Sequence, residues 1–426
     1  MRQQVNLWRG LTVAVAASVV LWAYYLFSCV DVSYNPVMTT KSNLTNTISR
    51  LCQWRPFGDR SVKSILSDRD DVILGQSCRK KTNFVFIKVH KAGGTAMCQL
   101  FYRFGLRHGL NFVLPNGSSD TTWFNLGWPY PLKESQYMRR INDEPFNILT
   151  NHAVYRRDVF HSIMPNDTVY LAILREPFSH LKSAMNYYAL PGKYKLPRKN
   201  TLTAFLRQPS FYEDPWRNRM RQPFSHTNLM SWDMGINFSA RLDAEYVEAY
   251  VTRLEREFML VLILEYLDAS LVLLKRYMCW DMVDILYKKR GPQSYRLKNV
   301  TATPELRAQH ENWSRADYIL YRHFNTSLWE KINREGRDFW AEVRTFRDMH
   351  ERTRRFCHPR ERSDNQSARL EFGPTPWSRR FHVDYQFCRL LRSRYAWMRN
   401  RAHVLREKRL SRLQGRRAPQ NVTKEV

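Results

Sequence analysis

The sequence has 426 residues, with 68 Lys+Arg against 39 Asp+Glu, and its formal net charge is +29. Hydrophobic residues make up 43% and aromatic residues 14% of it. This composition excludes a disordered chain and a disulfide-rich miniprotein, and the length fits one large domain with appendages or two domains. The excess of positive charge indicates an anionic partner: nucleic acid, a phosphate-bearing cofactor, an acidic glycan or a membrane surface.

The N-terminal region carries a predicted membrane anchor. Residues 11–30 contain no charged side chain, and a helix of that length spans the hydrocarbon core of a bilayer. Arginines precede this segment and Asp31 follows it, so the positive-inside rule makes residues 1–10 a cytoplasmic tail. Bulky aromatic residues stand where a cleaved signal peptide would have small ones. We therefore expect a type II signal anchor, followed by a polar lumenal stem over residues 31–77.

Glycosylation motifs and cysteines agree with a lumenal location. Nine Asn-x-Ser/Thr sites occur where chance predicts about three, at Asn43, Asn116, Asn166, Asn237, Asn299, Asn312, Asn325, Asn365 and Asn421. Six cysteines follow the anchor, at Cys52, Cys78, Cys98, Cys279, Cys357 and Cys388. They show no metal-binding spacing, so we expect disulfides of undetermined pairing. Cys98 falls inside a predicted helix and is a candidate for an unpaired core residue.

Beyond the stem, apolar runs alternate with helical patterns in the manner of a parallel α/β sheet flanked by helices. Predicted strands cover Phe84–Val89, Val169–Leu174 and Phe258–Leu264. Predicted helices follow over Ala96–Phe104, over Ser179–Tyr188, and from an N-cap at Asp268 to Trp280. We expect this domain to cover residues 78–350, with a basic helical extension over residues 351–426. That extension has either a solvated basic face or a contact surface for acidic glycans or lipid headgroups.

The turn after the first strand is a candidate anion site. Lys88, His90 and Lys91 lead into Gly93–Gly94–Thr95, and a helix is predicted to follow. Glycines at a helix N-terminus allow backbone N–H groups to approach an anion closely. The lysines precede the glycines and no Gly-Lys-Ser/Thr follows, so this is not a Walker A motif. Glycines also tighten ordinary strand-to-helix corners, which is the alternative reading.

A second cationic position follows the next strand. Arg175 comes directly after Leu174, and Ser183 follows in the predicted helix. An arginine at the carboxyl end of a central strand, together with a hydroxyl on the next helix, suits a second phosphate. Alternatively, Arg175 pairs with Glu176 or another neighbour. The two turns together predict a ligand with separated anionic groups.

These two motifs resemble those of a known family. Lys88-Val-His90-Lys91 with its Gly/Thr turn resembles the 5′-phosphosulfate loop of Golgi sulfotransferases, and Leu174-Arg175-Glu176-Pro177 with Ser183 resembles their 3′-phosphate site. Within that superfamily the sequence is most similar to the galactose 3-O-sulfotransferases, the group that contains the galactosylceramide enzyme. Supporting stretches lie at residues 106–117, 147–152, 264–287 and 321–329. The similarity covers roughly residues 78–350.

The resemblance implies a P-loop-like sulfotransferase domain in the Golgi membrane. Its donor would be 3′-phosphoadenosine 5′-phosphosulfate (PAPS), and its acceptor the 3-hydroxyl of a terminal β-galactose on a glycolipid or glycoprotein. The chemistry requires no metal, nucleic acid is not an expected partner, and a homodimer is left open. The phosphosulfate would be held by Lys88, Lys91, Gly93, Gly94 and Thr95, and the 3′-phosphate by Arg175 and Ser183. Gly94, Thr95 and Ala96 stand where the family usually has two serines and a threonine.

Sulfuryl transfer resembles in-line phosphoryl transfer, so it needs a cation at the leaving oxygen and a base at the acceptor hydroxyl. We assign the cation to Lys91. For the base we favour His152, at the end of the strand-like stretch 147–151, over His90 in the donor loop and over the carboxylate of Glu265.

Other features of the sequence fit more than one role. Aromatic residues that suit either sugar stacking or core packing are Trp123, Trp128, Tyr187 and Tyr188. The Lys288–Gly291 turn is either an exposed loop or a contact for donor or acceptor. Two alternative functions are a sulfotransferase for a uronyl or hexosamine position and an inactive relative that binds acidic glycans.

Overall fold

The computed structural model describes residues 78–116, 125–213, 226–288, 295–358 and 367–413. The predicted tail, anchor and stem lie outside these residues. Within the described ranges, no helix is both long and apolar enough to cross a membrane. The predicted span over residues 11–30 lies outside the described ranges, so this finding does not test it.

A four-stranded parallel sheet forms the centre of the domain. Its strand order is β2-β1-β3-β4, and its strands are β1 (Phe84–Ile87), β2 (Ile148–Leu149), β3 (Val169–Leu174) and β4 (Phe258–Ile263). β1 pairs with β3 from Phe84 opposite Val169 onward, and all three pairings are parallel. Nearly every strand residue is buried, as unbroken apolar runs predict for a sheet covered on both faces. This confirms the predicted α/β class with its parallel sheet and flanking helices.

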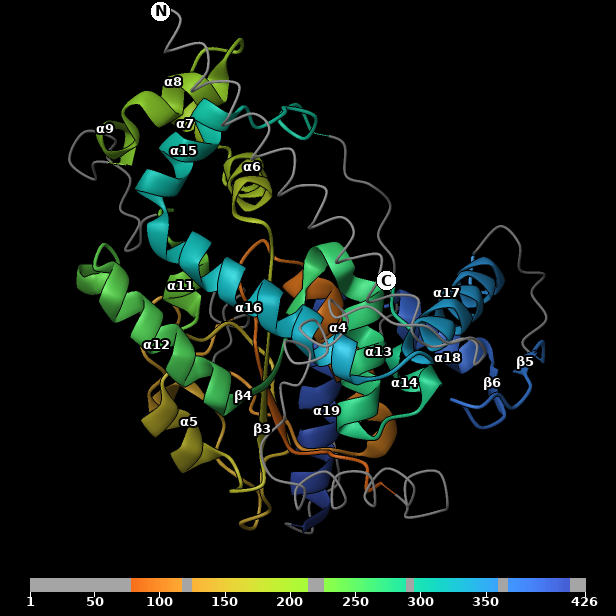
Figure 1. The fold of residues 1–426 in the computed structure, drawn as a ribbon. Helices are drawn as coiled ribbons and strands as arrows, with labels where there is room; N and C mark the ends of the chain where they lie inside the picture. The colour runs from red at the N-terminus through yellow and green to blue at the C-terminus, as the bar shows by residue number, and fades with distance from the viewer. Residues whose placement is uncertain (1–77, 117–124, 214–225, 289–294, 359–366, 414–426) are drawn as a thin grey trace, which may run out of the picture. The chain divides into compact units, whose positions relative to one another are not determined.

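Helices cover the sheet and bury its apolar faces. α12 (Ala244–Glu257), α13 (Leu267–Met278) and α16 (Arg315–Arg334) pack against β4, and α17 (Phe339–Phe356) packs against α13 (Figure 1). The predicted N-cap at Asp268 is wrong, because α13 already begins at Leu267. The Asp268 carboxylate instead accepts hydrogen bonds from Tyr287 Oη (3.1 Å) and Arg347 Nε (3.0 Å).

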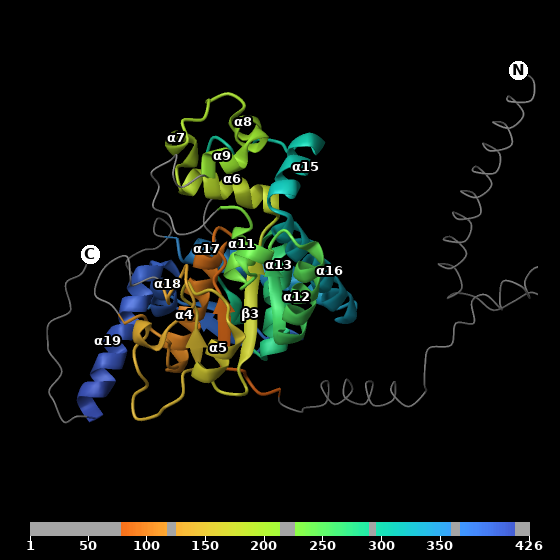
Figure 2. The ribbon, with the colours of Figure 1, turned by 90° about the vertical axis from the view of Figure 1, so that its left-hand side faces the viewer.

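A second, smaller apolar core follows the carboxyl end of β3. It is built by α6 (Pro177–Tyr187), α7 (Leu190–Lys193), α8 (Thr201–Arg207), α9 (Pro209–Glu213) and α15 (Pro304–Trp313). Phe178, Met185 and Phe205 are among its buried residues. These helices gather at the top of both ribbon views (Figures 1 and 2). Because α6 begins directly after β3, this core lies at the carboxyl edge of the sheet.

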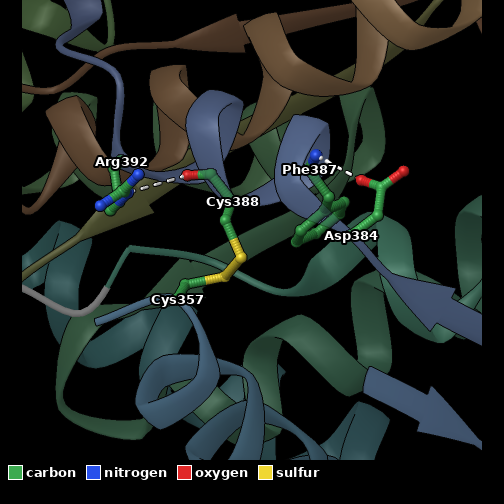
Figure 3. The surroundings of a disulfide bond; sticks show 5 residues. All are labelled: Cys357, Asp384, Phe387, Cys388 and Arg392. Carbon is green, nitrogen blue, oxygen red and sulfur yellow. Dashed lines mark hydrogen bonds between the residues drawn. A yellow bond between two sulfur atoms is a disulfide. The ribbon is translucent and has the colours of Figure 1, made fainter. Parts of the chain in front are cut away.

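The C-terminal region is tied to the domain. The antiparallel pair β5 (Leu370–Phe372) and β6 (Phe381–Val383) leads into α18 (Tyr385–Arg392) and α19 (Tyr395–Leu413), and both helices pack against α4 (Gly94–His108). Figure 3 shows the disulfide that joins Cys357, after α17, to Cys388 in α18. The Asp384 carboxylate caps α18 by accepting from the Phe387 backbone N–H at 2.7 Å. The described part of the basic extension is thus a packed part of this fold.

The remaining cysteines have structural positions as well. Cys78 is bonded to Cys279, which links the start of the described chain to the end of α13. Cys98 is buried and carries a free thiol, as expected, and its Sγ donates to Thr150 O at 2.9 Å. Cys52 lies outside the described residues. The shorter elements are α5 (Arg157–Ile163), α11 (Leu229–Asp233), α14 (Met282–Ile285), η1 (Glu134–Gln136), η2 (Phe238–Ala240) and η3 (Leu264–Tyr266).

Candidate functional site

The turn between β1 and α4 is a tight cradle at the carboxyl edge of the sheet. Lys91 and Gly93 both have left-handed backbones, with φ of 56° and 85°, and Gly93 is the N-cap of α4. A Cβ atom on Gly94 would lie 2.9 Å from Lys88 Cγ and 3.2 Å from Val89 O, so only glycine fits there without displacing the loop. The first N–H groups of α4 and the positive end of its dipole open onto this turn, which is the geometry of an anion site.

The two loop lysines rest on aromatic rings. Lys88 Nζ lies 4.1 Å from the centre of the Tyr395 ring in α19, and Lys91 Nζ lies 3.7 Å from the ring centre of Tyr187 in α6. Tyr395 also donates from Oη to Asn151 Oδ1, just after β2. Cation–π contacts of this kind hold an ammonium group in place without neutralising its charge. The turn therefore presents two oriented cations.

Arg175 connects the first turn to the second. Its Nη1 donates to the Lys91 carbonyl oxygen at 3.2 Å. Glu176 does not pair with Arg175 but caps α6, accepting from the Ser179 backbone N–H at 2.7 Å, and it forms an ion pair with Arg307 at 2.7 Å. Both strand ends thus contribute cations to one region at the carboxyl edge of neighbouring strands.

Ser183 lies on the face of α6 that is turned toward the first loop. His180, three positions before it, donates from Nε2 to the His90 carbonyl oxygen at 2.8 Å, and Tyr187, four positions after it, carries the Lys91 ammonium group. Residues three and four apart lie on one side of a helix. The structure therefore brings the sequence-predicted loop residues and Ser183 to the same edge of the sheet.

Two histidines, a tryptophan and a carboxylate meet beside the cradle. The His90 and His152 rings are stacked, with centres 3.9 Å apart and planes at 17°, and the Trp128 ring lies 4.2 Å from His90. His90 Nδ1 lies 2.9 Å from Asp233 Oδ2, and Trp128 Nε1 donates to Asp233 Oδ1 at 2.7 Å. His152 lies three residues after β2, which ends at Leu149 and is shorter than the predicted stretch 147–151. Sequence reasoning missed Asp233.

Burial and positive charge hold the nearby imidazoles neutral. Burial, together with the charges of His90, Lys88 and Lys91, keeps the pKa of His152 well below its usual range. Its Nδ1 is buried and has no hydrogen-bond partner among the described residues. Burial also lowers the pKa of His180 to about 3. A neutral imidazole has one nitrogen that can accept a proton, but a depressed pKa also makes it a weaker base.

The other sequence candidates take less central positions. Glu265 accepts from the Glu176 backbone N–H at 3.1 Å, and burial raises the pKa of its carboxyl. Tyr188 lies 4.9 Å from the His226 ring, and Lys288 Nζ donates to the Arg392 carbonyl oxygen at 2.8 Å. Trp123 and residues 289–291 fall outside the described ranges. Among the described residues, no group of three or more His, Cys, Asp and Glu side chains forms a potential metal site.

A parallel sheet flanked by helices, with a glycine turn after one strand and an arginine after its neighbour, defines an α/β domain whose architecture is consistent with a sulfotransferase. A profile of the galactose-3-O-sulfotransferase family matches residues 4–380. The chain belongs to this family.

Similarity to single members supports the assignment. Galactosylceramide sulfotransferase of Homo sapiens is 32% identical over 307 residues, 70% of each chain. Galactose-3-O-sulfotransferase 2 of Homo sapiens is 35% identical over 258 residues, 60% of this chain and 62% of that protein. Galactose-3-O-sulfotransferase 3 of Mus musculus is 33% identical over 277 residues, 64% and 62% of the two chains.

Proposed function

We propose that this protein is a sulfotransferase that moves the sulfuryl group of PAPS to the 3-hydroxyl of a terminal β-galactose on a glycolipid or glycoprotein glycan. Its relatives carry the names galactosylceramide sulfotransferase and galactose-3-O-sulfotransferase. The observation that carries the proposal is the pair of adjacent strand ends, where the cradle of Gly93 and Gly94 lies beside Arg175. A donor with separate anionic groups on the 3′ and 5′ oxygens of its ribose requires two such sites.

The residues present fit this donor. Lys88, Lys91 and the backbone of Gly93–Thr95 would bind the phosphosulfate, because a Cβ-free turn and two cations suit a compact anion. Arg175 and Ser183 would bind the 3′-phosphate, and guanidinium groups form paired hydrogen bonds with phosphate oxygens. When bound, the donor supplies an activated sulfuryl group.

The chain's own residues would then perform two tasks. Lys91 stabilises the negative charge that develops on the leaving phosphate oxygen, a contribution that is typically worth about 10²–10³ in rate. One of the two stacked imidazoles, His90 or His152, takes the proton of the acceptor hydroxyl. This scheme uses no metal ion, and the remaining candidate Glu265 is held by the Glu176 backbone and Tyr321.

We further place the protein in the Golgi membrane as a single-pass type II enzyme. Residues 11–30 would form the anchor and the catalytic domain would face the lumen, where galactose-bearing glycans and PAPS meet it. Two disulfides in the described domain support an oxidising compartment, and nine glycosylation motifs agree with it.

An acceptor panel tests the proposal. The full chain in detergent is incubated with radiolabelled PAPS and with terminal galactosides, uronic acid glycans and hexosamine glycans, and the linkage of each product is determined. We expect sulfate on the 3-hydroxyl of galactose. Product on uronic acid or hexosamine alone would overturn the galactose assignment, and glycan binding without transfer would indicate an inactive relative.

A variant pair connects this activity to the cradle. Lys91→Ala should lower kcat by about 10²–10³, whereas Lys193→Ala, an exposed lysine at the end of α7, should leave kcat at the wild-type value. Equal activity of the two variants would remove Lys91 from the mechanism.

A further inference from the structure

Asp233 accepts hydrogen bonds from three directions beside the cradle. Its carboxylate accepts from the His90 backbone N–H at 2.7 Å, from His90 Nδ1 at 2.9 Å and from Trp128 Nε1 at 2.7 Å. Its side chain is only 1% exposed. An indole N–H and a backbone N–H can only donate, so both stabilise the ionised carboxylate. Asp233 is therefore a buried anion whose hydrogen-bond partners are fixed.

The short helix that carries Asp233 is itself held in place. Asp317 in α16 accepts from the Ser231 backbone N–H and from Ser231 Oγ, both at 2.7 Å. The Tyr155 backbone N–H donates to the Asp233 carbonyl oxygen at 3.0 Å. Contacts at the middle and at the C-terminal end of α11 thus fix where the carboxylate points.

This geometry determines the tautomer of His90. Because an ionised carboxylate only accepts, Nδ1 of His90 carries the proton, and Nε2 is left as the proton acceptor. On this basis, and resting on the proposed function, we propose that Asp233 is a positioning residue that makes His90 the general base of sulfuryl transfer. The acceptor hydroxyl would lie at Nε2.

His152 is less suited to this task than the sequence suggested. It is stacked on His90, and its Nδ1 is buried without a partner among the described residues. A protonated His152 would be repelled by the same cations as a protonated His90, but it lacks the stabilising contact that Asp233 makes with His90. The ionisable groups around His90 on the packed elements are Lys88, Lys91, His152, Arg175, His180, Tyr188 and Asp233. Among these, Asp233 is the anion that directly contacts an imidazole.

The proposed step balances atoms and electrons. Oxygen O3 of the acceptor galactose forms a bond to sulfur, and the hydroxyl proton moves to Nε2 of His90. The bond between sulfur and the bridging oxygen breaks, and its electron pair stays on the phosphate oxygen of the leaving adenosine 3′,5′-bisphosphate. Asp233 then stabilises the imidazolium through Nδ1–H.

Asp233→Asn tests the assignment, because it removes the charge and keeps one acceptor oxygen. The His90 backbone N–H and the Trp128 indole N–H bond to different carboxylate oxygens, so one of them then faces the amide NH2 group. We expect kcat to fall by about 10²-fold or more, with the KM for the donor changed little. The pH profile of kcat should also change, because the imidazolium that forms during transfer loses its carboxylate partner. Asp243→Asn, which alters the N-cap of α12, is the matched control and should keep the wild-type profile.

Two further measurements separate a positioning role from a structural one. In the His90→Asn background, which removes Nε2, adding Asp233→Asn should cause no further loss of kcat. Nitrogen-15 NMR of histidine-labelled wild type should show His90 protonated at Nδ1, and this readout needs neither activity nor a folded variant.

The outcomes distinguish the two proposals. A wild type that sulfates no galactoside refutes the proposed function, while the NMR signal still tests the Asp233–His90 pair. An active wild type whose Asp233→Asn variant keeps its kcat and pH profile refutes the positioning role, as does an Nε2-protonated His90.

Discussion

Replacing Gly94 tests how closely the cradle depends on the absence of a side chain. In Gly94→Ala the added Cβ would lie 2.9 Å from Lys88 Cγ and 3.2 Å from Val89 O, so Lys88 or the helix start must shift. Crowding of this kind costs about 1–3 kcal/mol, offset by up to about 1 kcal/mol from the better helix propensity of alanine. We expect the free energy of unfolding to fall by roughly 0–3 kcal/mol.

The effect on donor binding should be larger than the effect on stability. Displacing Lys88 removes one hydrogen bond to a charged group, worth about 1.5–3 kcal/mol, so the Kd for PAPS should rise by about 10- to 150-fold. Gly192→Ala is the matched control, because Gly192 lies in α7 and no other group stands within 4 Å of its added Cβ. Calorimetric titration and urea unfolding of both variants provide the comparison. A Gly94→Ala protein that binds PAPS as tightly as Gly192→Ala would refute the steric argument.

Three more variants probe other parts of the account. Arg175→Ala should raise the Kd for PAPS at least about tenfold while heparin affinity persists; unchanged PAPS binding would count against the phosphate site. The double variant Cys357→Ala/Cys388→Ala removes the disulfide that joins residues 31 positions apart. Its free energy of unfolding should be lower by about 3–4 kcal/mol, which would appear as a fall in Tm of several degrees. An unchanged Tm would contradict this. Because the pKa of His180 falls to about 3 on folding, its contribution to stability is present above its unfolded pKa of about 6.5 and is lost as pH falls toward 3. The urea midpoint of His180→Gln should therefore decline less with acid than that of wild type, and equal decline would refute the argument.

Local patterns were enough to predict the sheet and the two turns. The apolar run of β3 agrees with the prediction residue for residue, and β4 ends one residue early, at Ile263. β1 ends at Ile87 because the chain turns there, with the Val89 N–H bonded to the Ile87 carbonyl oxygen. α6 starts at Pro177, earlier than expected, because the Glu176 carboxylate already caps it. Periodicity identifies the elements, whereas caps and turns determine their ends.

Contacts between distant segments were not predictable. Asp233 meets His90 across 143 positions of sequence, and no motif around Asp233 indicates that role. Tyr395 lies in a segment whose most evident feature is basic charge, yet its ring forms a cation–π contact with the Lys88 ammonium group. Such partners depend on how α11 and α19 pack, and a single sequence carries no local signal for that packing. The cradle was therefore predicted in its backbone but not in the side chains that orient it.

Titration of PAPS into the full chain tests the central claim, that two neighbouring strand ends bind opposite ends of one donor, most directly. We expect one-to-one binding that weakens as salt is raised. Adenosine 5′-phosphosulfate, which lacks the 3′-phosphate, should bind more weakly to wild type but as well as PAPS to Arg175→Ala. Absence of any binding heat from a folded protein, or equal affinity of wild type for both compounds, would contradict the claim.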